Sequence, residues 1–245
     1  MRLFISLLIV FSIQAHAKEY TFLSEITPPY SYSNKNGSAG IYRNILDNAF
    51  KDSKHTYVLK NVNAKALMIA IKHKKSDAVI GVSTYAPYYS DFKSTVSIGS
   101  ITLNPITANN YSLPRPYAQS LSSKIVGVVY GVGFEQLMPQ INMVTYTYAL
   151  QGVVKLFNNE VDVIIEDPLI IKCTSDSIPG LTPSNKSLYV HYPLVKSLDL
   201  YIGLFSSDQE VIDLLNKATK IANINTLYDS YNKLCNATSN IINIK

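Results

Sequence analysis

Two neighbouring carboxylates, Glu166 and Asp167, are the residues of this chain best placed for chemistry. They follow the apolar run 161–165 and precede Pro168. Such a run predicts a buried strand, and open α/β sheets bind ligands at the carboxyl ends of their strands. Carboxylates there would accept hydrogen bonds from an amine or a hydroxyl. The alternative is helix capping, because aspartate commonly precedes a helix whose first residue is proline.

A glycine pair is the second candidate feature. Gly131-Val132-Gly133 stands between a predicted strand, 124–129, and a predicted short helix, 134–138. Backbone N–H groups at a helix N-terminus can hold an anion without a charged side chain. The alternative is a tight turn from strand to helix, for which glycine supplies the backbone freedom.

Other patterns of catalysis are missing from the sequence. His55, His73 and His191 stand apart without metal-ligand spacing, and no phosphate-binding loop or nucleophile motif occurs. We therefore expect no metal, no cofactor and no catalytic residue. The formal net charge is +5, but the densest basic run, 72–75, ends a predicted helix, where cations are favourable. Nucleic acid is not an expected partner.

Residues 1–17 predict a secretory signal peptide. Arg2 gives a positive start, residues 3–13 are largely apolar, and Ala15-His16-Ala17 is an A-x-A cleavage site. The apolar run is too short for the ~30 Å hydrocarbon core of a membrane. We expect export to the periplasm, without a lipid anchor because no cysteine follows the apolar run.

The chain has two cysteines, Cys173 and Cys235. In an oxidising compartment, two cysteines so far apart predict one disulfide. It would close a loop of about 60 residues and contribute roughly 4 kcal/mol in the chain-entropy model. Two buried free thiols are the alternative.

The elements that position these residues alternate between strands and helices. The first half has predicted strands and helices at 20–25, 41–50, 56–59, 64–74 and 78–82. The second half continues with 124–129, 134–138, 143–145, 148–157 and 161–165. Such alternation indicates parallel sheets, and the likeness of segments 66–80 and 149–165 indicates two similar lobes.

Two extended stretches, 98–108 and 200–205, would cross between these lobes. We therefore predict an α/β fold with lobe 1 at 18–100 and 198–245, and lobe 2 at 101–197. A hinge of two crossing strands places a cleft between the lobes. Closure around a small ligand is the motion expected of such a cleft.

Taken in order, the segments resemble the extracellular solute-binding proteins of family 3, the polar amino-acid type with the type II periplasmic-binding-protein fold. The resemblance covers essentially the whole chain after residue 17. The segments that carry it are PPYSY (28–32), Gly37, Gly40-Ile41, 76–81, LSSKIVGVVYGVG (121–133), EVDVIIEDP (160–168) and LYDSYNKL (227–234).

The resemblance matches Asp167 to the aspartate with which the family binds an α-ammonium group. The family's carboxylate-binding arginine falls near Tyr88, in a segment that has no arginine. A tyrosine cannot make the bidentate, charged contact of an arginine with a carboxylate. The resemblance therefore implies a ligand other than an ordinary α-amino acid.

The same comparison implies the other ligand-binding residues. Ser83 falls where the family often has a ligand-facing hydroxyl, and the aromatic faces would come from Tyr30, Tyr32, Tyr85 and Tyr88. About half of such tyrosines would be structural. Together with Glu166, Asp167, Gly131 and Gly133 they favour a cationic amine, an amino-acid derivative or a small polar ligand.

The leading interpretation is a monomeric periplasmic solute-binding protein without enzymatic activity. It would pass its ligand to an ABC-type membrane permease or signal to a sensor. A bond between Cys173 and Cys235 would tether lobe 2 to the C-terminal helix near lobe 1 and limit opening. The alternative is an enzyme similar to periplasmic cyclohexadienyl dehydratases, with Glu166 or Asp167 as the acid.

Overall fold

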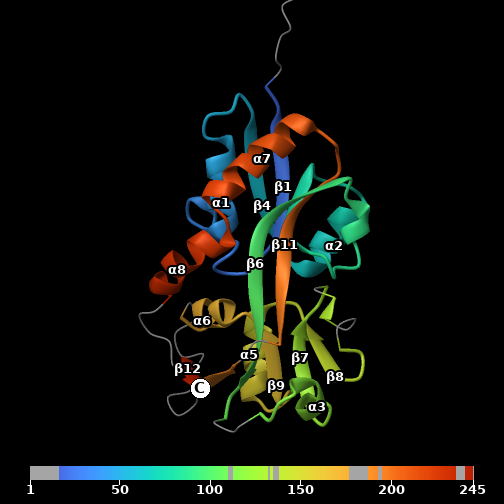
Figure 1. Cartoon of the computed structure of the whole chain (residues 1–245), viewed down its shortest axis with the longest axis vertical. Helices are drawn as coiled ribbons and strands as arrows, with labels where there is room; N and C mark the ends of the chain where they lie inside the picture. The colour runs from blue at the N-terminus through green and yellow to red at the C-terminus, as the bar shows by residue number, and fades with distance from the viewer. Residues whose placement is uncertain are drawn as a thin grey trace, which may run out of the picture.

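The computed structural model has two lobes, one above the other along the long axis of the molecule (Figure 1). The structure describes residues 17–109, 113–131, 133–134, 138–176, 187–192, 195–235 and 241–244. Two long strands, β6 (Ser94–Thr107) and β11 (Lys196–Leu204), run side by side from the upper lobe into the lower one. They are the two predicted crossing strands, and the two-lobed α/β fold is confirmed.

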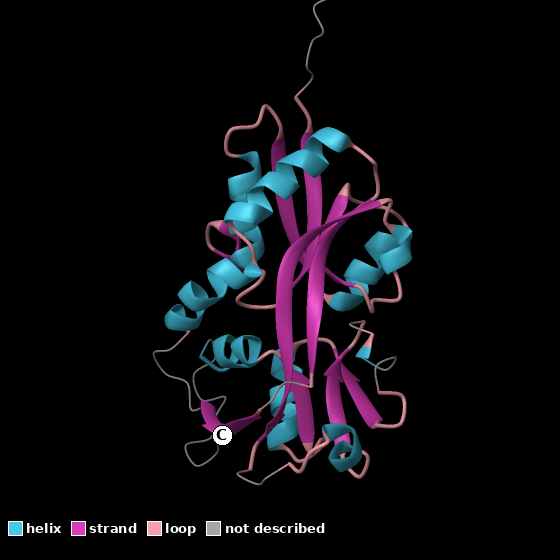
Figure 2. Cartoon of the chain, viewed as in Figure 1, coloured by secondary structure: helices cyan, strands magenta, loops and turns pink. Residues whose placement is uncertain are grey.

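The upper lobe is built on a parallel sheet. Its strands are β1 (Glu19–Glu25), β4 (Thr56–Val62) and β5 (Ala78–Ser83). β1 lies between the other two and runs parallel to both. The lobe also contains α1 (Ile41–Phe50), α2 (Ala64–Lys72), α7 (Gln209–Ile221) and three short elements, β2 (Tyr32–Asn34), β3 (Gly37–Ala39) and η1 (Tyr89–Asp91). Figure 2 shows the helices packed around the sheet.

The lower lobe repeats this plan. Its strands are β7 (Ile125–Val129), β8 (Asn142–Tyr146) and β9 (Val163–Glu166), with β7 parallel to both neighbours. Its helices are α3 (Tyr117–Leu121), α5 (Ala149–Phe157) and α6 (Pro168–Asp176). The predicted helix 134–138 lies mostly outside the described residues.

The two parallel units are joined into one sheet by antiparallel pairing. The strand order is β4-β1-β5-β11-β6-β9-β7-β8. β11 is antiparallel to β5 and β6, and β6 is antiparallel to β9. Because the same two strands belong to both lobes, bending of β6 and β11 moves one lobe against the other.

The helices follow the apolar spacing of the sequence. α1 buries Ile41, Ile45 and Leu46 on one face, the spacing of an amphipathic helix. α2 begins after Asn63, whose side chain accepts a hydrogen bond from the Ala66 N–H at 2.8 Å. It ends at Lys72, two residues before the predicted end, because Lys74 has a φ of 49°. A left-handed residue cannot continue a right-handed helix.

The C-terminal region returns to both lobes. α8 (Ile224–Leu234) packs against α1 and β6. β12 (Ile241–Ile244) instead pairs with β10 (Leu188–His191), which also pairs with the lower part of β6. The lobe boundaries remain a prediction, and within the range assigned to lobe 1 this last strand lies beside the second lobe.

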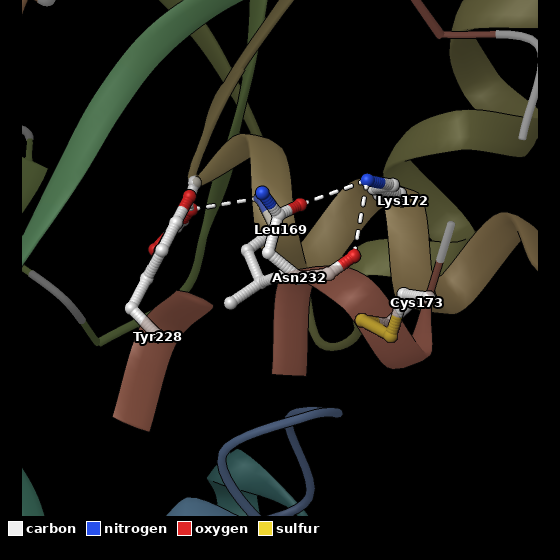
Figure 3. Close-up of a disulfide and its surroundings, with 7 residues drawn as sticks. Leu169, Lys172, Cys173, Tyr228 and Asn232 are labelled. Carbon is white, nitrogen blue, oxygen red and sulfur yellow. Dashed lines mark hydrogen bonds between the residues drawn. A yellow bond between two sulfur atoms is a disulfide. The ribbon is translucent and has the colours of Figure 1, made fainter. Parts of the chain in front are cut away.

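The predicted disulfide between Cys173 and Cys235 is present. Figure 3 shows it between α6 of the lower lobe and the end of α8, beside a second contact. There the Lys172 ammonium donates to Asn232 Oδ1 at 2.8 Å. On its other side α8 is held to the upper lobe, since the Asn44 amide donates to the Tyr231 hydroxyl at 3.0 Å. The bond therefore links a lower-lobe helix to a helix seated on the upper lobe.

The predicted signal peptide lies outside the described residues except for Ala17. Within the described part of the chain, no helix combines the length and the apolar character needed to cross a membrane.

Candidate functional site

A cavity of about 90 Å³ lies between the two lobes. This volume exceeds the roughly 10–15 Å³ that one water molecule requires. The wall includes the carboxyl ends of strands from both lobes, namely β1, β5, β7 and β9, and the middle of the crossing strands β6 and β11. The cavity therefore occupies the place where ligands bind in open α/β sheets.

Two carboxylates face this cavity from opposite lobes. Glu25 ends β1 in the upper lobe, and Glu166 ends β9 in the lower lobe. Glu166 is only 4% exposed. Its Oε1 accepts a hydrogen bond from the Asp167 N–H at 3.0 Å, whereas no hydrogen bond of ordinary geometry reaches its buried Oε2. The buried Tyr146 hydroxyl lies beside Glu166 and, as a hydrogen-bond donor, opposes the rise of the Glu166 pKa.

Burial raises the pKa of both carboxyl groups, because the charged form loses its hydration. The pKa of Glu25 rises to about 8. That of Glu166 also rises to about 8, chiefly by burial, and the charges of Asp167 and Glu25 add to the shift. The carboxyl groups of Glu25 and Glu166 thus have pKa values close to neutral pH, so each can exchange a proton there.

Asp167 lies behind the wall of the cavity rather than on it. It is fully buried, and the cavity lining does not include it. Its Oδ1 accepts the Leu169 N–H at 2.8 Å, which caps the start of α6, and its Oδ2 accepts the Tyr30 hydroxyl at 2.6 Å. Burial raises its pKa to about 6, against the opposing effect of the Tyr30 hydrogen bond. The structure thus contains the capping contact, together with a hydrogen bond between the lobes.

The structure separates the nine predicted ligand-binding residues into two groups. Those that line the cavity are Tyr30, Ser83, Tyr88, Gly131 and Glu166. Those outside its lining are Tyr32, Tyr85, Gly133 and Asp167. Val132 lies outside the described residues, as does most of the helix that would follow it, so the anion site at this turn stays a prediction.

Gly133 and Tyr85 meet across the boundary between the lobes. Gly133 follows β7 and has a φ of +79°, and a Cβ placed on it would lie 1.8 Å from the Tyr85 carbonyl oxygen. The glycine is required there because no side chain fits between the two backbones. Gly133 and Tyr85, which were predicted to bind the ligand, therefore contribute to the contact between the two lobes.

Comparison with known proteins identifies the fold. No protein-family model matches the sequence, and no curated protein matches it. Among solved structures, a mutant of arginine-bound ArgBP from T. maritima has a TM-score of 0.66 and 13% identity, covering 84% of this chain and 95% of that chain. The GluR0 ligand-binding core from Nostoc punctiforme, in complex with (L)-glutamate, has a TM-score of 0.67 and 15% identity, covering 89% and 100%.

A third solved structure, the substrate binding protein of an amino acid ABC transporter, has a TM-score of 0.64 and 15% identity, covering 88% of this chain and 96% of that chain. This chain has the two-lobed fold of periplasmic binding proteins. The interlobe cavity of this binding-protein fold is accordingly the candidate site, and its lining decides what it accepts.

The described part of the lining carries acids and phenols. Among the described residues that line the cavity there is no lysine, arginine or histidine, and Tyr88 stands where the resemblance places an arginine. Nor do the described residues contain a cluster of three side chains able to hold a metal ion. The cavity therefore favours a cation over an anion.

Sequence reasoning missed Glu25, Tyr42, Phe134 and Tyr148, which all line the cavity. Glu25 has the same signal as Glu166, a carboxylate at the carboxyl end of a predicted strand. Tyr42 had no such signal, since it lies in a helix. Its hydroxyl reaches the cavity over Gly81, where a Cβ would lie 2.5 Å from it.

The raised carboxyl pKa values predict how stability depends on pH without ligand. Glu25 and Glu166 have ordinary values of 4.5 and folded values of about 8. The folded state therefore binds these protons more tightly than the unfolded state. Their contribution is fully present below the ordinary value and is lost as pH rises through about 8. We expect the melting temperature of Glu166→Gln to fall less than that of the wild type across this window. Equal pH slopes in calorimetry would contradict the assignment.

Proposed function

We propose that this protein is a solute-binding protein that captures a small polar or cationic solute by closing its lobes. The observation that carries the proposal is the cavity between the lobes, which Glu25 and Glu166 face from opposite sides. The other polar groups of the wall are the hydroxyls of Thr27 and Ser83 and several tyrosines, whose aromatic faces can attract a cation. The site fits an amine better than an ordinary amino acid, whose carboxylate would find no basic side chain among the described lining residues.

In this proposal, closure of the two lobes around the ligand contributes much of the binding free energy. When the lobes meet, the ligand loses contact with water, and its charged hydrogen bonds strengthen in the drier site. A few preorganised partners then suffice for micromolar affinity, which corresponds to about 8 kcal/mol. The Tyr30–Asp167 hydrogen bond and the Gly133–Tyr85 contact both form across the closed boundary.

We further propose that the chain belongs to family 3 of the extracellular solute-binding proteins and acts as a monomer in the periplasm. It would hand its ligand to an ABC-type permease or signal through a membrane sensor. The order of the resembling segments supports the family, and the fold shared with the substrate binding protein of an amino acid ABC transporter supports the role.

A thermal-shift screen of the mature protein tests the proposed function. Amines, amino acids, nucleosides and small sugars are added separately at matched pH. A ligand that binds only the folded state stabilises it by about 2.7 kcal/mol at a hundredfold excess over Kd. We expect a clear rise in melting temperature with amines, and none with sugars. A screen in which no small solute shifts the melting temperature would overturn the proposal.

A second candidate function follows from the protonated state of the buried acids. A carboxyl group with a pKa of about 8, such as Glu166, can donate a proton at neutral pH. An enzyme similar to cyclohexadienyl dehydratases would use it on prephenate or arogenate. Turnover of either compound by wild type, and its loss in Glu166→Gln, would favour this function over simple binding.

A further inference from the structure

We propose that the ligand is a short aliphatic diamine, with one ammonium group held by Glu25 and the other by Glu166. This inference rests on the proposed function and specifies the ligand class of the same site. Glu25 becomes a specificity-determining residue that neither the sequence reasoning nor the resemblance assigned.

The balance of charge in the cavity favours a dication. The cavity has an acid on each wall, and its described lining includes no basic side chain. A buried carboxylate is costly unless a cation or a proton neutralises it. A monoamine can pair with only one of the two acids at full strength, and the other must stay protonated. A dication pairs with both, so the two charges support binding together.

Glu166 has spare hydrogen-bonding capacity. Its Oε1 is occupied by the Asp167 N–H, whereas no hydrogen bond of ordinary geometry reaches its buried Oε2, and the Tyr146 hydroxyl lies beside this carboxyl group. A buried acceptor without a partner costs free energy that a bound donor recovers. An ammonium group has three N–H donors and satisfies such an atom well.

An apolar surface separates the strands that carry the two acids. The sheet order places the crossing strands β11 and β6 between β1, which ends at Glu25, and β9, which ends at Glu166. The aliphatic side chains of these crossing strands that line the cavity are Ile101, Leu103, Leu198 and Leu200, and Phe134 lines it as well. These surfaces suit a methylene chain and offer nothing to a hydroxylated or carboxylated one. A chain that is apolar in the middle and cationic at both ends matches this arrangement.

A ligand of this kind would also favour closure of the two lobes. Glu25 belongs to the upper lobe and Glu166 to the lower lobe, and the two carboxyl groups already interact across the cavity. Burial and their mutual repulsion favour the protonated, uncharged form of both groups when the ligand is absent. A dication between them displaces both protons and pairs with a carboxylate on each side. The ligand would thus bind the closed form in preference to the open form.

Isothermal titration with matched ligands tests the proposal. Putrescine and cadaverine are compared with butylamine and pentylamine, which keep the carbon chain but lose one ammonium group. γ-Aminobutyrate and lysine replace or add a carboxylate. We expect a diamine to bind the wild type at least tenfold more tightly than its monoamine and more tightly than either carboxylate-bearing ligand.

Three variants test which residues cause the preference for a diamine over a monoamine. Glu25→Gln and Glu166→Gln each keep the shape of the side chain and remove one charge, so the ratio of diamine to monoamine affinity is expected to fall toward one. Glu19→Gln is the matched control, because Glu19 lies exposed at the far end of the same strand as Glu25. It removes the same charge and is expected to keep the preference.

The outcomes separate the two proposals. If another class of solute binds and the wild type shows no preference for diamines, the inference is wrong and the proposed function stands. If the preference survives in Glu25→Gln, this residue does not hold the second ammonium group. If no small solute binds, both proposals fail. The wild-type ratio is informative even if a variant does not fold.

Discussion

Gly133→Ala is expected to stop the lobes from reaching their closed arrangement. The added Cβ would lie 1.8 Å from the carbonyl oxygen and 2.5 Å from the carbonyl carbon of Tyr85. Both atoms belong to the backbone, so no change of side-chain rotamer relieves the clash, and the lobes must separate. Small-angle scattering with ligand should show a larger radius of gyration than the wild type. Ligand affinity should fall at least tenfold, about 1.4 kcal/mol.

Gly131→Ala is the matched control for this experiment. Gly131 has a φ of +84°, close to the +79° of Gly133, but no atom lies within 4 Å of its added Cβ. Both variants therefore carry a similar backbone strain, of order 1 kcal/mol, and only one carries the clash. If Gly133→Ala closes as fully as Gly131→Ala, the contact with Tyr85 does not limit closure.

Removing the disulfide is expected to produce the largest loss of stability. The Cys173–Cys235 bond joins residues 62 positions apart. In the chain-entropy model, a loop of this length contributes about 4 kcal/mol by restricting the unfolded chain. Domains of ordinary size are stable by only about 5–15 kcal/mol. Urea unfolding of the Cys173→Ser/Cys235→Ser double variant should therefore show a much lower midpoint than the oxidised wild type.

The urea midpoint of the wild type under reducing conditions is the comparison for the double variant. A reducing agent should bring the wild type close to the double variant and should leave the double variant unchanged. Because the bond also joins α6 to α8, the ligand-free double variant should show a larger radius of gyration in scattering. An unchanged urea midpoint would show that other contacts of α6 and α8, such as Lys172 with Asn232, are sufficient.

The sequence was sufficient for the parallel strands of both lobes and for most of the helices that connect them, but α3, β10 and β12 were not predicted. Strands β1, β5 and β9 were predicted because buried apolar runs are short and bounded by polar turns. The helices were predicted from the spacing of residues such as Ile41, Ile45 and Leu46. These patterns are local, so neighbours along the chain determine them. The ends were less certain, as at Lys74, because a single φ angle ends a helix.

The candidate site could be predicted only in part. Glu166 was identified because the end of a strand is where an open sheet presents its ligand site. Asp167 follows it directly but faces the Tyr30 hydroxyl and the start of α6. Adjacent residues at the end of a strand point in different directions, and nothing in the sequence states which one the opposite lobe will contact.

The sequence by itself determined two repeated α/β units, two crossing strands, a pair of cysteines and carboxylates at the ends of strands. Tertiary structure alone decided that Glu25 and Glu166 share a cavity, that Tyr42 reaches over Gly81 into it, and that Gly133 meets Tyr85. The physical reason is that periodicity and turn chemistry act over a few residues. The cavity depends on the packing of segments that lie far apart in the chain, which only the folded arrangement of both lobes specifies.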